Sequence, residues 1–299
     1  METARPASDL GLFGPDSVTW RVNLSPAMIV SAGAAVLLEM LHPKVMRMID
    51  QASTFRTHPD VRVRLTTEYT NTITYGDTTQ AETAGETLRY IHGMRKASDP
   101  ETGQEYGADE PDLLLWVHSA QHWCTLRALD RYGPKLSPQE KDRFLTEQKI
   151  AARLVGIDPS RAPGSVAELD AYMEGMRGRL AFVAETAWMR DMIVPPGFSL
   201  KPQSVLRKLV GNACLDLLTH EMRVLYGFHS WPASRHWLVS RLTKLLLDLA
   251  GAKVTFAKAL PAIRSQIQAH AFGRRAVQEN ADRRARKDVG GPSSGVPGP

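Results

Sequence analysis

The sequence predicts an all-α fold, and three observations support this prediction. Apolar residues recur at helical spacing in several long segments. Serine or threonine stands three positions before glutamate at the start of such segments, which is the pattern of a helix capping box. No run of several residues alternates between apolar and polar with the period of a strand. We therefore expect helices packed around a common core.

The first helices are predicted from prolines, glycines and capping residues. Ser25-Pro26 offers an N-cap serine followed by a proline in the first turn. His42-Pro43 is expected to end or kink that helix, and a second apolar helix follows it. A third helix is predicted over residues 60–74 and closes at Gly76, although the threonines and tyrosines near its end leave a strand as the alternative.

Later helices are predicted from the same kinds of signal. Capping boxes are expected to begin at Thr79, Ser137 and Ser165. A long helix over residues 112–132 is expected to end at Gly133-Pro134. These segments therefore continue the helical series through the middle of the chain.

Two more apolar segments, residues 205–218 and 237–249, are predicted to be helices. Residues 96–103 are expected to form an exposed loop between helices, and residues 193–197 are the best internal linker. We expect one helical domain over residues 15–275, preceded by a flexible segment of residues 1–14. Residues 276–299 are basic and then rich in glycine and proline, which predicts a disordered tail.

Composition restricts the class of protein. Of the 299 residues, 43% are hydrophobic and 23% are charged, which is ordinary for a soluble domain whose core can enclose a cofactor. Cys124 and Cys214 lie far apart and form no CxxC pair, which favours a reducing compartment, and we expect the protein to be cytoplasmic. The N-terminus lacks the pattern of a signal peptide. Residues 26–41 are too short and too polar for a membrane span, and they predict a buried helix.

Basic residues at the C-terminal end contribute to a formal net charge of +5. Such a tail can contact nucleic acid or anionic lipid, but more often it is solvated, so we expect no specific binding of nucleic acid. The oligomeric state is left open.

Common catalytic motifs are absent from the sequence. It contains no HExxH, no paired CxxC and no GxSxG. His118 and His122 stand four residues apart on one predicted helix, which is compatible with a metal site. Because tryptophans flank this pair, an aromatic core is the favoured alternative.

His92 is the most informative candidate residue. It belongs to a predicted apolar helix stripe that consists of Ala81, Ala84, Leu88, Ile91, His92 and Arg95. An imidazole buried there needs a partner, because an unpaired buried polar group is costly. The partner is a haem iron or, as the spacing alone favours, a backbone carbonyl.

Arg62 and Thr66 form a second candidate group. They stand four residues apart and therefore share one face of a helix. A guanidinium and a hydroxyl on one face suit an oxyanion or dioxygen on which negative charge develops. By spacing alone, a solvent-exposed arginine and a threonine without a special role are the favoured alternative.

Over about residues 15–275, the chain resembles the bacterial oxygenase family that groups latex-clearing proteins (rubber oxygenases) with MpaB-type oxygenases. It is most similar to a branch of short actinobacterial members. Each matching element is short, but their order is fairly specific. These elements are Asp16-Ser-Val-Thr-Trp-Arg-Val22, Leu41-His42-Pro43, Phe55-Arg56, Arg62-Val-Arg-Leu-Thr66-Thr-Glu-Tyr69, Thr74-Tyr-Gly76, Ile91-His92, Tyr106-Gly-Ala-Asp-Glu-Pro-Asp-Leu-Leu-Leu-Trp-Val-His118 and Arg131-Tyr-Gly133.

The resemblance implies a globin-like helical core, with additional N- and C-terminal helices, that binds haem b. By this resemblance, His92 in the segment that begins at Leu88 is the proximal iron ligand, and Arg62 and Thr66 line the distal side. The latex-clearing proteins carry a lysine at the position of Leu65, so an open or water-bound sixth iron position is expected here.

Three further residues, His42, Tyr69 and His118, match positions typical of the family. Packing or support of the ligands is as plausible a role for them as catalysis.

The sequence therefore predicts a haem b-dependent oxygenase that uses O2 on an apolar substrate, which is isoprenoid, lipid-like or aromatic. The alternative is a helical protein that binds haem or an apolar ligand without turnover.

Overall fold

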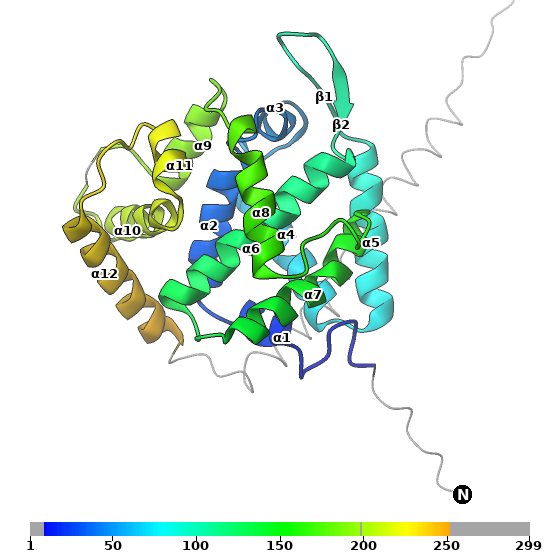
Figure 1. Ribbon diagram of the computed structural model, residues 1–299. Coiled ribbons are helices and arrows are strands. Elements are labelled where there is room, and N and C mark those ends of the chain that lie inside the picture. The colour runs from blue at the N-terminus through cyan, green and yellow to red at the C-terminus, as the bar shows by residue number, and fades with distance from the viewer. Residues whose placement is uncertain (1–8, 198, 252–299) are drawn as a thin grey trace, which may run out of the picture.

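A computed structural model describes residues 9–197 and 199–251 of the chain (Figure 1). This part is helical apart from one two-stranded hairpin, so the predicted all-α fold is confirmed. The elements are α1 Val18–Asn23, α2 Met28–Glu39, α3 Pro43–Ala52, α4 Pro59–Tyr75, α5 Thr78–Gly93, β1 Lys96–Ser98, β2 Glu105–Gly107, α6 Pro111–Tyr132, α7 Pro138–Val155, α8 Val166–Met176, η1 Arg177–Arg179, α9 Thr186–Ile193, α10 Pro202–Leu217, α11 His220–Leu225 and α12 Ala233–Gly251.

Helices α2 and α6 pack against each other at the centre of the fold (Figure 1). Their contact buries apolar residues of α2 such as Leu37 and Leu38, together with Trp116 of α6. Between them, the hydroxyls of Ser31 and Thr125 form a buried hydrogen bond of 3.0 Å. The residues predicted as a buried helix thus form part of the core.

The chain turns sharply at His42-Pro43, as predicted. Helix α2 ends at Glu39, α3 begins at Pro43, and the two axes meet at 103°. Among the described helices, none is long and apolar enough by itself to cross a membrane, whereas this bent pair passes the same test of length and composition. The N-cap predicted at Ser25 is wrong. Ala27 takes that position, and the Ser25 hydroxyl accepts the Ala27 N–H within the preceding turn.

Helices α4 and α5 are joined by a very short connection. Residues 60–74 are helical and Gly76 closes α4, so the strand alternative is wrong. A Cβ at Gly76 would lie 2.5 Å from the Thr72 carbonyl oxygen, which explains why glycine stands there. The capping box expected at Thr79 is also wrong, because it begins at Asp77, whose carboxylate accepts the Gln80 N–H at 2.7 Å.

The two later capping predictions have different outcomes. Ser137 and Glu140 form the complete reciprocal box that begins α7. Ser165 caps α8 through the Glu168 N–H, but the Glu168 carboxylate accepts the Gly164 N–H and does not bond back to Ser165. The second prediction is therefore only half right.

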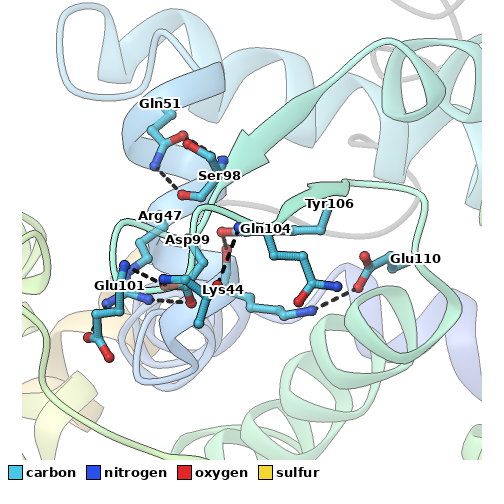
Figure 2. A network of polar contacts seen from close by, with 10 residues as sticks. Lys44, Arg47, Gln51, Ser98, Asp99, Glu101, Gln104, Tyr106 and Glu110 are labelled. Atoms are coloured by element: carbon cyan, nitrogen blue, oxygen red, sulfur yellow. Dashed lines mark hydrogen bonds and ion pairs between the residues drawn. The ribbon is translucent and has the colours of Figure 1, made fainter.

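Residues 96–107 form a β-hairpin, so the exposed loop predicted over residues 96–103 is wrong for residues 96–98, which form a strand, whereas residues 99–103 lie in the connection between the two strands. Strands β1 and β2 pair antiparallel, with Ala97 opposite Tyr106. Figure 2 shows how the hairpin is attached to α3. The Gln51 amide bonds to both the N–H and the carbonyl of Ser98 at 2.9 Å, and the Arg47 guanidinium pairs with Asp99 at 2.8 Å. Helix α3 thus supplies bonds that three-residue strands lack by themselves.

The C-terminal helices are connected as expected. Residues 193–197 link α9 to α10, and residues 205–218 and 237–249 fall largely within α10 and α12. Both the tail over residues 276–299 and the end of the predicted domain lie outside the described residues. The predicted domain limits therefore stay predictions.

Asp216 holds α10, α6 and α12 together. Its side chain has no exposed surface, and it accepts hydrogen bonds from Arg131 at 2.7 Å, from the Trp231 indole at 3.0 Å and from Ser240 at 3.2 Å. His236 also pairs with it. One buried carboxylate thus receives donors from two helices and a loop.

We expect Asp216→Ala to lower the free energy of unfolding by about 3–5 kcal/mol, because removal of one partner of a buried ion pair leaves its donors unpaired. Chemical denaturation would measure this change. Asp248→Ala is the matched control, because Asp248 pairs with Lys244 on the exposed side of α12, where such a pair is worth about 0.3–0.5 kcal/mol. Equal losses in the two variants would contradict the structural role of Asp216.

Candidate functional site

The turn at Gly76-Asp77 packs α5 against α4. Arg62 lies in the first turns of α4, far from this connection, and His92 lies in the last turn of α5, also far from it. Burial lowers the pKa of His92, and the positive charge of Arg62 lowers it further, as expected for side chains on two helices that pack against each other. The structure therefore brings Arg62 and His92 into one region.

His92 is a neutral histidine with a free ring nitrogen. Burial first, and the Arg62 charge second, lower its pKa to about 4, while Asp109 opposes the shift. Its Nδ1 is buried and has no hydrogen-bond partner among the described residues. Neutral imidazole is the form that binds metals, and a buried nitrogen without a partner is costly. This side chain thus fits a haem iron, for which one protein ligand is enough.

The predicted stripe around His92 is mostly correct. Ala81 and Ala84 are buried, while Leu88, Ile91 and His92 are half-buried. Arg95 is an exception, because α5 ends at Gly93 and Arg95 is exposed, where it donates to the Ala52 carbonyl at 2.6 Å. Leu88 stands one helical turn before His92 on the same face of α5, so it can contact a group bound at His92.

Arg62 is a half-buried cation that lacks a direct partner. Its guanidinium makes no hydrogen bond or ion pair within the part of the chain that the structure describes. Burial lowers the pKa of Arg62, Arg95 lowers it further by like-charge repulsion, and Glu39 opposes both. Arginine nevertheless stays protonated at neutral pH. A charged, unpaired guanidinium beside His92 can bind an anion or a partly negative oxygen.

Thr66 and Leu65 lie one turn further along α4. Thr66 is exposed, and its hydroxyl donates to the Arg62 carbonyl at 3.0 Å, so its oxygen remains free to accept a hydrogen bond. Leu65 is half-buried, and the buried residues of α4 begin only at Thr72. The Arg62–Thr66 face of the helix is therefore open to a ligand.

Glu39, the last residue of α2, is a site residue that the sequence analysis missed. Protein surrounds its carboxyl group and raises the pKa to about 8 by desolvation, against the opposing charge of Arg62. Part of the side chain still has accessible surface, and no hydrogen bond to this carboxyl forms between described residues. An acid at the end of an apolar helix was the only signal in the sequence.

Tyr69 lies on α4 beyond Leu65 and adjoins α5. Burial raises the pKa of its phenol, while the Arg89 charge acts in the opposite direction. Arg89 in turn donates to the Leu154 carbonyl at 2.8 Å. Tyr69 thus joins α4, α5 and α7 at the edge of the region that contains Arg62.

His42 and His118 lie in other surroundings. His42 packs beside Trp116, with ring centroids 6.0 Å apart, and Arg179 and Lys44 add to the effect of burial in lowering its pKa to about 4. His118 is buried in α6 and packs against His122 in a tilted arrangement, with ring centroids 4.3 Å apart. The Nδ1 of His42 is buried without a described partner, as that of His92 is, and its neighbour Trp116 donates to the Glu39 carbonyl at 3.2 Å. No hydrogen bond, ion pair or ring contact between described residues joins either His42 or His118 directly to Arg62 or His92, so their roles stay predictions.

The possible metal site at His118 and His122 lacks free ligands. His122 uses Nδ1 with the His118 carbonyl at 2.6 Å and Nε2 with the Gln148 side chain at 3.0 Å. Over residues 9–197 and 199–251, no group of three or more His, Cys, Asp or Glu side chains could hold a metal ion. The aromatic-core alternative is thus favoured for this pair.

Two surface pockets of about 330 and 300 Å³ occur near the start of α2 and the end of α6. Trp20 and Leu24 line the first, and Tyr132 and Leu247 line the second. Neither contains Glu39, Arg62 or His92. The candidate site is therefore defined by unpaired polar side chains on an open helix face, and not by either of these pockets.

Comparison with known proteins supports one family. Searches of curated proteins and of solved structures gave no match to the chain. A family model described as "ER-bound oxygenase mpaB/B'/Rubber oxygenase, catalytic domain" matches residues 20–247. This range includes Glu39, Arg62, Thr66 and His92 and covers most of the chain, so the protein belongs to the mpaB/rubber oxygenase catalytic-domain family.

Proposed function

We propose that the protein is an oxygenase that holds haem b through His92 and acts with O2 on an apolar substrate. The observation that carries this proposal is the neutral His92 ring, which has a buried unpaired nitrogen and lies within the electrostatic influence of the unpaired Arg62 guanidinium. Membership of an oxygenase family supplies the reaction class. The haem and the class of substrate are our own inference from these side chains.

Bound haem would supply the redox-active iron for dioxygen chemistry, and the chain supplies ligation and polarity. His92, in the last turn of α5, would hold the iron. Arg62 donates hydrogen bonds to negative charge that develops on oxygen, which is the type of stabilisation that matters most in enzymes. Thr66 accepts a hydrogen bond as it stands, or donates one after it leaves the Arg62 carbonyl. Leu65 has no polar atom in its side chain, so it would neither donate to bound oxygen nor ligate the iron.

Exposed apolar side chains support an apolar substrate. Val63 of α4 is 56% exposed and Met94, at the end of α5, is 58% exposed. They neighbour Arg62 and His92 in sequence, and Leu65 and Leu88 are only half-buried. A lipid-like, isoprenoid or aromatic molecule placed over these side chains would remove apolar surface from water.

Glu39 is suited to hold a proton in this region. With a pKa of about 8, its carboxyl group is protonated at neutral pH and can donate. Acids whose pKa lies near the working pH are efficient proton donors. We propose that Glu39 supplies or accepts a proton when the oxygenated substrate is formed.

We expect Glu39→Gln to flatten the pH dependence of stability. The unfolded chain releases this proton above about 4.5, whereas the folded protein keeps it up to about 8. As the pH rises from about 4.5 to about 8, the free energy of unfolding of the wild type should therefore decrease. The glutamine variant should not show this decrease. Urea titrations at pH 5, 6.5 and 8 would measure it. Parallel curves for wild type and variant would show that Glu39 is ordinary and solvated.

A spectrum and an oxygen-uptake assay test the function. The purified protein should show a Soret band that shifts on reduction with dithionite and again on exposure to O2. An isoprenoid alkene such as squalene should then cause O2 consumption. A protein without the band would refute the haem assignment. A Soret band without O2 uptake on isoprenoid, fatty or aromatic substrates would favour the alternative, a non-catalytic haem or apolar-ligand binder.

A further inference from the structure

The outer side of α12 carries a row of exposed leucines. Leu238, Leu242, Leu245 and Leu249 are 50%, 43%, 56% and 59% exposed. Their spacing of four, three and four residues places them on one stripe, as in the seam between two packed helices. We call these four residues the leucine stripe. Exposed apolar stripes of this kind mark contact surfaces.

The other side of α12 is already packed. Val239, Thr243 and Leu247 are buried against the body of the protein. Arg235 fixes the start of the helix by bonding to Asn212 at 2.9 Å and stacking on Trp231 at 4.1 Å. The leucine stripe is therefore a second apolar face on a helix that is held in place.

Charged residues bound the stripe on one flank. Lys244 and Asp248 form an exposed ion pair of 3.1 Å, and Arg241 is exposed beside them. Charged side chains are usually exposed to solvent, whereas leucine side chains are usually buried. Trp237, which is 58% exposed beneath Arg241, and Leu246, which is 39% exposed, extend the apolar surface on either side of the stripe. The exposed apolar surface therefore follows the length of the helix, as an amphipathic segment would require.

The residues that follow α12 have the matching pattern. Phe256, Leu260, Ile263 and Ile267 are also spaced by four, three and four residues. Pro261 divides this pattern, because it suits the first turn of a helix that would carry Ile263 and Ile267, while Phe256 and Leu260 precede that helix. The match to the family model ends at residue 247, before this segment begins.

We propose that residues 253–272 of this chain dock on the leucine stripe of α12. The segment begins two residues after α12 ends, so its binding is intramolecular, with an effective concentration of about millimolar for a short connection. Gly251 lies at the joint, where glycine lets the chain reverse. A second copy of the chain would have to compete with this tethered segment.

Thiol labelling of the full chain tests the proposal. Cys124 and Cys214 have no exposed surface and should stay unreactive, so an introduced cysteine reports on its own position. In Leu245→Cys, a maleimide should label at least about tenfold more slowly than in Lys244→Cys, its exposed neighbour. Truncation after Gly251 should abolish this difference.

A second variant guards against misfolding of the truncated chain. In full-length Leu245→Cys, adding Ile263→Glu and Ile267→Glu should speed labelling, whereas Ser265→Glu with Gln268→Glu should not. Equal labelling at positions 244 and 245 in the full chain would overturn the proposal. Protection that grows with protein concentration and accompanies a dimer in analytical ultracentrifugation would assign the stripe to a second copy. Protection only with phosphatidylcholine–phosphatidylserine vesicles would assign it to a membrane.

Discussion

His92→Ala should give a folded protein that does not retain haem. Removal of the imidazole removes the only protein ligand that we assign to the iron, and loss of supporting groups alone lowers metal affinity by about 10–100-fold. The loss here should therefore be at least about 100-fold. The fold should survive, because the His92 Nδ1 makes no hydrogen bond to any described residue. The ratio of Soret to 280 nm absorbance, with circular dichroism for folding, measures both properties.

His42→Ala is the control for this prediction. His42 is also half-buried, and its pKa is also lowered to about 4, but it lies beside Trp116 with Arg179 and Lys44 nearby. It should keep its haem. Full haem occupancy with an unchanged spectrum in His92→Ala would remove His92 as the ligand. Haem loss in His42→Ala alone would move the site to the corner between α2 and α3.

The sequence predicted helix ends correctly where a proline or glycine at the end itself determines the backbone conformation. His42-Pro43 separates α2 from α3, and Gly76 ends α4, because proline and glycine restrict or release the backbone at those points. The error at Thr79 shows the limit of such signals. Asp77 and Thr79 are both good capping residues, and Asp77 prevails because it follows directly on the end of α4 and Gln80 completes its box.

The hairpin could not be predicted from its own residues. Each strand has three residues, too few for an alternating pattern to be recognised. Its stability comes from Arg47 and Gln51 of α3, which lie about fifty positions earlier in the chain. Such contacts between distant segments carry no local signal.

The candidate site was predictable in part. Helical spacing placed His92 on an apolar stripe and Arg62 with Thr66 on one face, and the tight α4–α5 connection brings Arg62 near His92. Glu39 could not be predicted as a site residue, because it belongs to another helix and its carboxyl group is desolvated and influenced by Arg62 only in the folded chain. His42 contacts Trp116, which bonds to the backbone of Glu39, whereas His118 packs against His122 inside the core.

Arg62→Ala should keep haem and lose most of the activity. The guanidinium forms no bond that holds the fold together among the described residues, so its removal costs little stability. Loss of one donor to developing negative charge lowers kcat by about 10²–10³ in other enzymes. Steady-state O2 uptake with saturating alkene would measure the loss. Arg62→Lys keeps the charge but not the forked geometry of the guanidinium. Its kcat should therefore lie between those of the wild type and Arg62→Ala.

A readout on the haem-free protein separates this role from a structural one. The Arg62 charge helps burial to lower the pKa of His92 to about 4. In Arg62→Ala, NMR titration of apoprotein should therefore give a higher His92 pKa, whereas Arg64→Ala, which removes an exposed arginine paired with Glu68, should not change it. A raised pKa together with lost turnover and intact haem would place Arg62 beside the metal ligand. An unimpaired rate would show that the oxygen chemistry proceeds without its charge.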